Sequence, residues 1–184
     1  NLGCYDTLTQ TVSVYENPSA WFGFSKACSN QPIQFTDSSS SSIGQVTTWE
    51  WNFSTGISNN QNPTYSFPSD FAYGVTLVAS TQYGCSDTIT RYVIVNKTPD
   101  FTITSPDHCL GNNVQLQYNP APGSSPNNVF FWDFGDNTAS FQPNPSHLYL
   151  TEGDYAVNLQ VTNPGNSCFS TKYDTIHVFT RPIA

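Results

Sequence analysis

An acidic stretch beside a tryptophan, FFWDFGDN at residues 130–137, holds the residues of this chain best suited to chemistry. Asp133, Asp136 and Asn137 could offer oxygen atoms to a calcium ion, which binds oxygen ligands in loops. The alternative is a turn in which the side-chain oxygens accept hydrogen bonds from nearby backbone N–H groups. Because the spacing does not fit an EF-hand loop, we expect the turn and predict no cofactor, with structural calcium as the alternative.

Other groups that could catalyse a reaction lack the partners that each mechanism needs. Residues 133–135 spell the metal-binding DFG triplet of protein kinases, but no glycine-rich loop, strand lysine or HRD loop accompanies it. No GxSxG nucleophile motif occurs, and the histidines at positions 108, 147 and 177 do not have metal-ligand spacing. We therefore predict that the chain is not an enzyme and has neither catalytic residues nor a metal site.

The composition favours β-strands and argues against two classes of partner. Of the 184 residues, 15% are aromatic and only 10% are charged, and turn-forming residues are abundant. A net charge of −8 argues against nucleic acid, whose binding needs a basic surface. No apolar run approaches the roughly 20 residues that cross a bilayer as a helix. We predict no membrane-spanning segment in this sequence.

Cysteines and tryptophans mark an internal repeat. The cysteines recur after 81 to 83 residues, from Cys4 to Cys85, from Cys28 to Cys109 and from Cys85 to Cys168. Trp51 and Trp132 each lie 23 residues after a cysteine. Self-similarity at a fixed period indicates a tandem array of like domains.

This repeat divides the chain into three parts. We predict that residues 1–19 are the last strand and linker of a preceding repeat, that 20–97 form one repeat, and that 98–184 form a second. Alternating apolar residues, as in YAVNLQV at 155–161, predict short, half-buried strands. About seven such strands per repeat, separated by turn residues, are typical of an immunoglobulin-like sandwich. The predicted fold class is therefore all-β, with tandem Ig-like β-sandwiches.

The stretch WDFGDN…QPNPSHLYLTEGDYAVNLQVTN at 132–163 resembles the polycystic kidney disease (PKD) repeat, whose hallmarks are a WDFGDG turn, NPxHxY and GxYxVxLxVxN. The first repeat keeps the strand pattern but has WNFSTGI (51–57) in place of that turn. The resemblance implies that Trp132 and Phe134 fill the core, that the aspartates face outward or cap the turn, and that His147 packs with a backbone hydrogen bond. The structural hallmark residues are Trp51, Trp132, Asp133, Phe134, Gly135, Asp136, His147 and Tyr155.

A surface role follows from the same resemblance. It implies spacing, adhesion or contact with proteins and glycans, and the cysteine-bearing repeats look most like the PKD arrays of giant bacterial adhesins, including gliding-motility adhesins. The predicted function is a stiff spacer and contact module of a long extracellular adhesin or filament. Its partners would be neighbouring repeats, other copies in a fibre, or a surface glycan or protein. The alternatives are an accessory domain pair of a secreted hydrolase and a glycan-binding module.

Asp-Thr followed by an aliphatic residue occurs three times, in each version of the predicted last strand. The pattern resembles the O-glycosylation acceptor that gliding bacteria and their relatives use on exported proteins. The candidate acceptors are Thr7, Thr88 and Thr175. The alternative is that Asp ends a turn and Thr begins a strand, as their propensities favour.

Cysteines at fixed repeat positions predict disulfides and an oxidising compartment. In the implied sandwich, Cys28 and Cys109 lie at the end opposite to Cys85 and Cys168. A strand of about 8 residues spans roughly 26 Å, whereas a disulfide needs Cα atoms within about 7 Å, so cysteines of one repeat should not pair. We expect a Cys28–Cys168 bond between end-to-end repeats. The alternative is Cys4–Cys28 with Cys85–Cys109, two pairs that share a separation of 24 residues.

Overall fold

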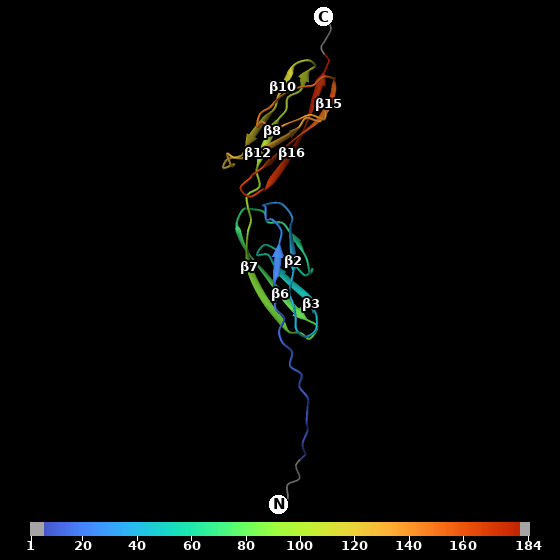
Figure 1. Ribbon diagram of the computed structural model, residues 1–184, viewed down its shortest axis with the longest axis vertical. Coiled ribbons are helices and arrows are strands. Elements are labelled where there is room, and N and C mark those ends of the chain that lie inside the picture. The colour runs from blue at the N-terminus through green and yellow to red at the C-terminus, as the bar shows by residue number, and fades with distance from the viewer. Residues whose placement is uncertain (1–5, 181–184) are drawn as a thin grey trace, which may run out of the picture. The chain divides into compact units, whose positions relative to one another are not determined.

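The computed structural model describes residues 6–180, which divide into two compact units (Figure 1). The first unit comprises the described residues up to Ala27 together with 31–67 and 72–94. The second comprises Cys28–Asn30, Pro68–Phe71 and the chain from Val95 onward. Two short segments of the first sequence repeat are therefore part of the second unit.

Every regular element of the described residues is a β-strand, which confirms the predicted all-β fold class. β-Branched and aromatic residues favour the pleated strands, and Gly, Pro, Asn and Ser favour the turns between them. Residues 6–180 contain no helix long and apolar enough to cross a membrane.

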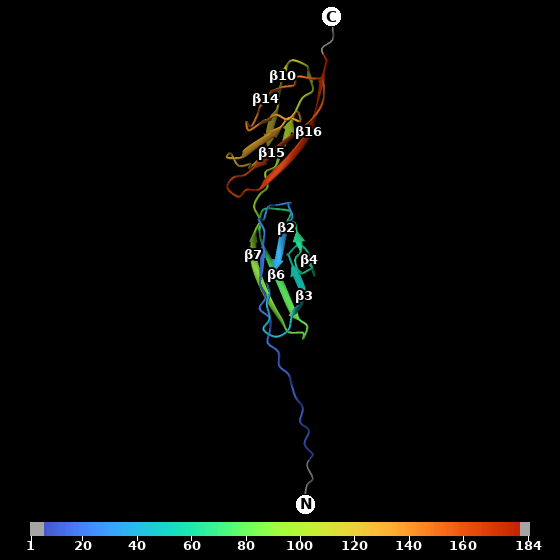
Figure 2. The same cartoon turned by 45° about the vertical axis from the view of Figure 1, so that its right-hand side comes forward.

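The first unit is a sandwich of two antiparallel sheets (Figure 2). One sheet has the order β1 (Phe22–Phe24), β2 (Ile33–Asp37), β5 (Thr64–Tyr65), and the other has the order β4 (Ile57–Ser58), β3 (Val46–Asn52), β6 (Ala72–Thr81), β7 (Ser86–Ile94). Alternate residues of β6 point inward, as a half-buried strand requires. The buried apolar side chains of this unit are Ala20, Phe22, Ala27, Ile33, Phe35, Trp51, Phe53, Phe67, Tyr73, Val75, Leu77, Ala79 and Val93.

The second unit has a similar plan, with one five-stranded sheet and two separate strand pairs. Its main sheet has the order β13 (Ala139–Ser140), β12 (Val129–Asp133), β15 (Gly153–Thr162), β16 (Phe169–Phe179), β9 (His108–Cys109), and β9 pairs with β16 in parallel. Two strand pairs complete it, β10 (Asn113–Gln115) with β14 (Ser146–Leu148) and β8 (Phe101–Thr104) with β11 (Gln117–Pro120). One core joins these sheets, formed by Phe101, Val114, Leu116, Trp132, Phe134, Tyr149, Val157, Leu159, Val161, Ile176 and Val178.

Residues 6–18 contain no regular strand, and their assignment to the last strand and linker of a preceding repeat stays a prediction. A β-strand needs a neighbouring strand to receive its N–H and C=O groups, and no described residue pairs with 6–18 in a ladder. Regular pairing begins only at Ser19, which bridges Ser40. The linker is nevertheless held at Tyr15, whose ring stacks on that of Tyr83 with 4.1 Å between centroids.

The hallmark turn after β12 brings the backbone unusually close to β15. Gly135 has a φ of 79°, and a Cβ added there would lie 2.6 Å from the carbonyl oxygen of Ala156. The first repeat has Ser54 at the matching position, with a φ of 68°. Its hydroxyl donates a hydrogen bond of 2.7 Å to the carbonyl oxygen of Gly74, the counterpart of Ala156. In the first repeat, a hydrogen bond from the serine side chain thus takes the place of the close backbone contact that glycine allows in the second.

We expect Gly135→Ala to lower the unfolding free energy of the protein by about 2–5 kcal/mol. A left-handed backbone costs an L-residue roughly 1–2 kcal/mol, and forcing the methyl group against Ala156 adds about 1–3 kcal/mol. Urea unfolding followed by fluorescence measures the loss.

Gly111→Ala is the matched control, because Gly111 has a φ of 84° but open space around the added Cβ. Its unfolding free energy should fall only by the cost of the left-handed backbone, about 1–2 kcal/mol. Equal losses in the two variants would show that the close approach to Ala156 is unimportant.

Candidate functional site

The acidic stretch at 130–137 forms a turn closed by its own carboxylates. Asp133 Oδ1 accepts a hydrogen bond of 3.0 Å from the backbone N–H of Gly135. Asp136 Oδ1 accepts one of 3.1 Å from the backbone N–H of Thr138, and the Thr138 hydroxyl donates to the same oxygen. Trp132 and Phe134 are buried between these polar residues. One oxygen of each aspartate considered for calcium therefore already has a backbone partner, as in other Asx turns.

His147 completes the turn from β14. Its Nε2 lies 2.7 Å from Asp136 Oδ2, and its ring stacks on Phe134 with 4.1 Å between centroids. The partners of Nε2 are therefore side-chain oxygens, of Asp136 and Thr138, and the backbone hydrogen bond expected for His147 is not made at this atom. Burial opposes ionisation of Asp136, but the hydrogen bonds from Thr138 and His147 lower its pKa below the ordinary value.

The first repeat has the same turn-closing hydrogen bond and the same ring stacking, made by different residue types. Asn52 Oδ1 accepts the backbone N–H of Ser54 at 2.8 Å, as Asp133 does in the second repeat. Phe53 stacks on Tyr65 with 4.2 Å between ring centroids, and Tyr65 stands where His147 stands. The Tyr65 hydroxyl lies 3.0 Å from Thr55 Oγ1. A hydrogen bond between two neutral hydroxyl groups therefore replaces the contact between His147 and the Asp136 carboxylate.

The other sequence candidates for metal or ligand binding do not gather in one place. In the part of the chain that the structure describes, no group of three or more His, Cys, Asp and Glu side chains could hold a metal ion. His177, on β16, lies 2.6 Å from Asp154, which raises the His177 pKa. Structural calcium stays an untested prediction.

Two tryptophans that are not fully buried, Trp21 and Trp49, have different surroundings. Trp21 is 52% exposed, and the guanidinium group of Arg91 lies 4.8 Å from its ring centroid. Trp49 is half-buried and donates its indole N–H to Asp37 Oδ2 at 2.8 Å. Only Trp21 therefore presents a broad aromatic surface to solvent.

The candidate glycosylation sites are exposed but not equivalent. Thr88 pairs with Val78 across the sheet, whereas Thr175 pairs with Ala156. The counterpart of Ala156 is Gly74, whose partner is Tyr92. The Asp-Thr motif of the second repeat is thus displaced by four residues along the last strand. Its position six residues after Cys168, rather than two after a cysteine as in the first repeat, already signals this shift.

Thr88 and Thr175 nevertheless share a setting. Both side chains are exposed, and they lie on β7 and β16, the last strand of each repeat. Thr7 is exposed as well, within the stretch that has no strand.

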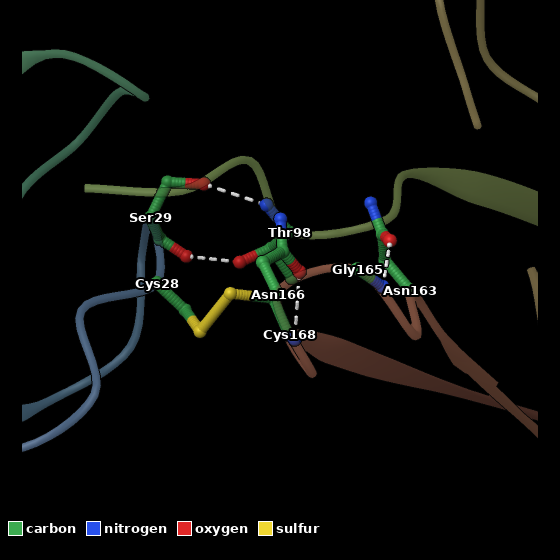
Figure 3. Close-up of a disulfide and its surroundings, with 7 residues drawn as sticks. All are labelled: Cys28, Ser29, Thr98, Asn163, Gly165, Asn166 and Cys168. Carbon is green, nitrogen blue, oxygen red and sulfur yellow. Dashed lines mark hydrogen bonds between the residues drawn. A yellow bond between two sulfur atoms is a disulfide. The ribbon is translucent and has the colours of Figure 1, made fainter. Parts of the chain in front are cut away.

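A disulfide between Cys28 and Cys168 is the strongest local constraint in the second unit (Figure 3). The two Cα atoms are 5.7 Å apart, within the usual range for a disulfide. Both cysteines are buried, at 2% and 0% exposure, although 140 positions separate them in the chain. Cys85 and Cys109 are free thiols, and Cys4 lies outside the described residues.

Hydrogen bonds hold the chain on both sides of this bond. The Thr98 N–H donates to Ser29 Oγ at 3.0 Å, and the Thr98 hydroxyl donates to the Ser29 carbonyl oxygen at 2.6 Å (Figure 3). The Cys168 N–H donates to Asn166 Oδ1 at 2.9 Å within its turn. No repeated pattern indicates the Ser29–Thr98 pair, because the second repeat has Leu110 at the position of Ser29.

Replacing Asp136 by Asn should make the stability of the protein less sensitive to acid. A carboxyl group with a lowered folded-state pKa stabilises the fold above its unfolded pKa of about 3.9, and this contribution is lost as pH falls through the folded pKa. The difference in unfolding free energy between the wild type and Asp136→Asn should therefore shrink as the pH falls from about 5 to about 2. Urea unfolding at each pH measures it.

Asp70→Asn serves as the control, because it removes one exposed carboxylate outside the turn. A wild-type advantage over Asp136→Asn that does not change with pH would contradict the role of the Asp136 carboxylate.

Comparisons with known proteins agree with this architecture. A family model described as "PKD domain" matches residues 15–95 and 96–178. Human polycystin-1 is 30% identical over 114 residues, which are 58% of this chain and 2% of that protein. Microbial collagenase of Vibrio alginolyticus is 53% identical over 32 residues, which are 17% of this chain and 4% of that protein. The chain thus spans a small part of either relative.

Two solved structures are similar to single repeats. The PKD1 domain of the Vibrio cholerae metalloprotease PrtV is 27% identical, with a TM-score of 0.41, and the match covers 44% of this chain and 99% of that one. The PKD1 domain of Vibrio anguillarum Epp is 21% identical, with a TM-score of 0.43, covering 46% and 99%.

Proposed function

We propose, from the premise that this chain belongs to the PKD domain family, that it is a stiff spacer and contact module of a long repetitive extracellular or cell-surface protein. PKD domains are non-catalytic modules, and the family match covers two of them in tandem. The observation that carries the proposal is the Cys28–Cys168 disulfide, because its two cysteines fall in different matches, at 15–95 and 96–178.

A covalent bond between two repeats limits their relative motion more strongly than a linker alone. Cys28 and Cys168 lie 140 positions apart, so the bond closes a long loop of chain. The short linker adds to this effect, since Thr98 hydrogen-bonds Ser29 and the next residue, Pro99, has a fixed φ. A fibre or surface stalk that must transmit force over a distance benefits from such restriction.

The location of the protein outside the cell has support from the same bond. Disulfides form and persist in secreted and surface proteins, whereas cytosolic thiols are kept reduced. The net charge of −8 suits a region that faces water. An adhesin or filament, including one of the gliding-motility type, is the role that we assign.

Removing the bond should let the two repeats tumble more independently. In the wild-type protein we expect one rotational correlation time for both repeats, measured by backbone 15N relaxation. In Cys28→Ser/Cys168→Ser each repeat should show a shorter time, because the linker alone then connects them.

The matched control is Cys85→Ser/Cys109→Ser, which removes two thiols but keeps the disulfide. It should tumble as the wild type does. A double variant without the bond that still has a single, unchanged correlation time would contradict the stiffening role.

We also propose that Thr7, Thr88 and Thr175 accept O-linked sugars in the native organism. Their exposure meets the first requirement of an acceptor, and each follows an aspartate in the pattern described above. Mass mapping of natively purified protein should find added sugar mass on these residues, and a Thr88→Val variant should lose it at that site alone. Bare threonines throughout the native protein would contradict the proposal.

The second candidate function is an accessory domain pair of a secreted hydrolase. The short match to a microbial collagenase favours it. If this role is correct, the protein should sediment with insoluble collagen fibrils, whereas the spacer role predicts that it stays in the supernatant. Denatured protein serves as the control for non-specific adhesion.

A further inference from the structure

The counterpart of each cysteine in the Cys28–Cys168 bond is present elsewhere in the chain as a free thiol. Cys109 follows Cys28 by one repeat of 81 residues, and Cys85 precedes Cys168 by one repeat of 83 residues. Cys109 is exposed and Cys85 is half-buried, whereas the bonded pair is buried.

The backbone around Cys109 is the same as that around Cys28. Cys28 forms a parallel bridge with Asn96, and the N–H of the next residue, Ser29, donates to the Asn96 carbonyl oxygen at 2.9 Å. Cys109 pairs in parallel with Phe179, and the N–H of the next residue, Leu110, donates to the Phe179 carbonyl oxygen at 2.8 Å. Each cysteine is therefore fixed beside the end of the last strand of its own repeat.

The turn that carries Cys85 also matches the one that carries Cys168. The carbonyl oxygen of Cys168 accepts the N–H of Asn163 at 2.8 Å, and that of Cys85 accepts the N–H of Thr81 at 2.9 Å. The residue before each cysteine has a positive φ, of 55° at Ser167 and 83° at Gly84. The two turns thus hold their cysteines by equivalent backbone contacts, although the turn before Cys168 is one residue longer.

From these matched settings, we propose that Cys109 and Cys85 are the two open halves of the cross-link already closed between Cys28 and Cys168. Each would bond to the complementary cysteine of another PKD repeat of this kind. Cys109 would bond to the cysteine that occupies the position of Cys85 in another repeat. Cys85 would bond to the cysteine that occupies the position of Cys109. The bond would cover a thiol that is exposed at Cys109 and half-buried at Cys85, where Sγ donates to the carbonyl oxygen of Tyr15 at 3.7 Å.

The chemistry is a thiol–disulfide exchange with a small disulfide oxidant such as oxidised glutathione. The thiolate of one cysteine attacks the glutathione disulfide and releases one glutathione thiol. The thiolate of the partner cysteine then attacks the mixed disulfide and releases the second. Two protein thiols are oxidised to one disulfide, and one glutathione disulfide is reduced to two thiols.

A mixing experiment tests the pairing with a second copy of this chain as the partner. One variant, Cys4→Ser/Cys85→Ser, keeps only the Cys109 thiol free, and the other, Cys4→Ser/Cys109→Ser, keeps only the Cys85 thiol free. The second is labelled with 15N, the two are mixed in equal amounts with oxidised glutathione, and the dimers are separated by mass.

Random collision of two equally reactive thiols gives heterodimers as half of all dimers. Complementary halves should give a heterodimer at least tenfold more abundant than either homodimer, with a Cys85–Cys109 linked peptide on digestion. A heterodimer share of one half or less would overturn the inference. Thermal unfolding of each variant confirms that both retain the wild-type fold.

The inference rests on the Cys28–Cys168 bond of the proposed function. The same digest should therefore be analysed for both the Cys28–Cys168 and the Cys85–Cys109 peptides. If the Cys28–Cys168 peptide is found but heterodimers are not preferred, the proposed pairing of Cys85 with Cys109 is wrong and the proposed spacer function is unaffected. Absence of the Cys28–Cys168 peptide overturns the premise of both proposals.

Discussion

Each repeat depends on burying one tryptophan in the core between its sheets while satisfying the indole N–H. The Nε1 of Trp51 donates to the carbonyl oxygen of Asn60 at 2.9 Å, and that of Trp132 donates to the carbonyl oxygen of Pro143 at 3.3 Å. An indole without such a partner would carry the cost of a buried, unpaired donor. The acceptor comes in both cases from the segment that follows the hallmark turn. The turn must therefore return the chain to the tryptophan, and its geometry decides whether the core can form.

Two different sequences meet that requirement. The second repeat uses glycine at the tight position, two aspartates and a histidine, and the first uses Ser54, Asn52 and Tyr65. What the two share is a side-chain oxygen that closes the turn and an aromatic ring stacked on the buried phenylalanine. This equivalence explains why the degenerate motif of the first repeat still folds. It also indicates that the acidic residues serve the architecture of the turn rather than a reaction.

The sequence allowed the fold to be predicted where a physical pattern is local. Period-2 alternation identified β6 and β15, and the hallmark motif identified the family. The partner of His147 could not be read, because a ring nitrogen can bond a backbone or a side-chain oxygen with equal ease. The four-residue displacement of Thr175 along the last strand depends on the pairing of β16 with β15, which the recurring Asp-Thr pattern does not specify. Ser29 and Thr98 were missed because their contact joins two loops and has no equivalent in the second repeat.

Residues 28–30 and 68–71 belong by sequence to the first repeat and by packing to the second unit. A gene segment cut at the sequence boundary near residue 97 would separate Cys168 from its partner and remove these segments from the unit that they complete. Recombination or duplication of single repeats would thus produce an unfinished domain unless a neighbour supplied the missing pieces. An insertion or deletion of repeats that keeps a folded protein must therefore preserve the junction between neighbouring repeats as well as the repeats themselves.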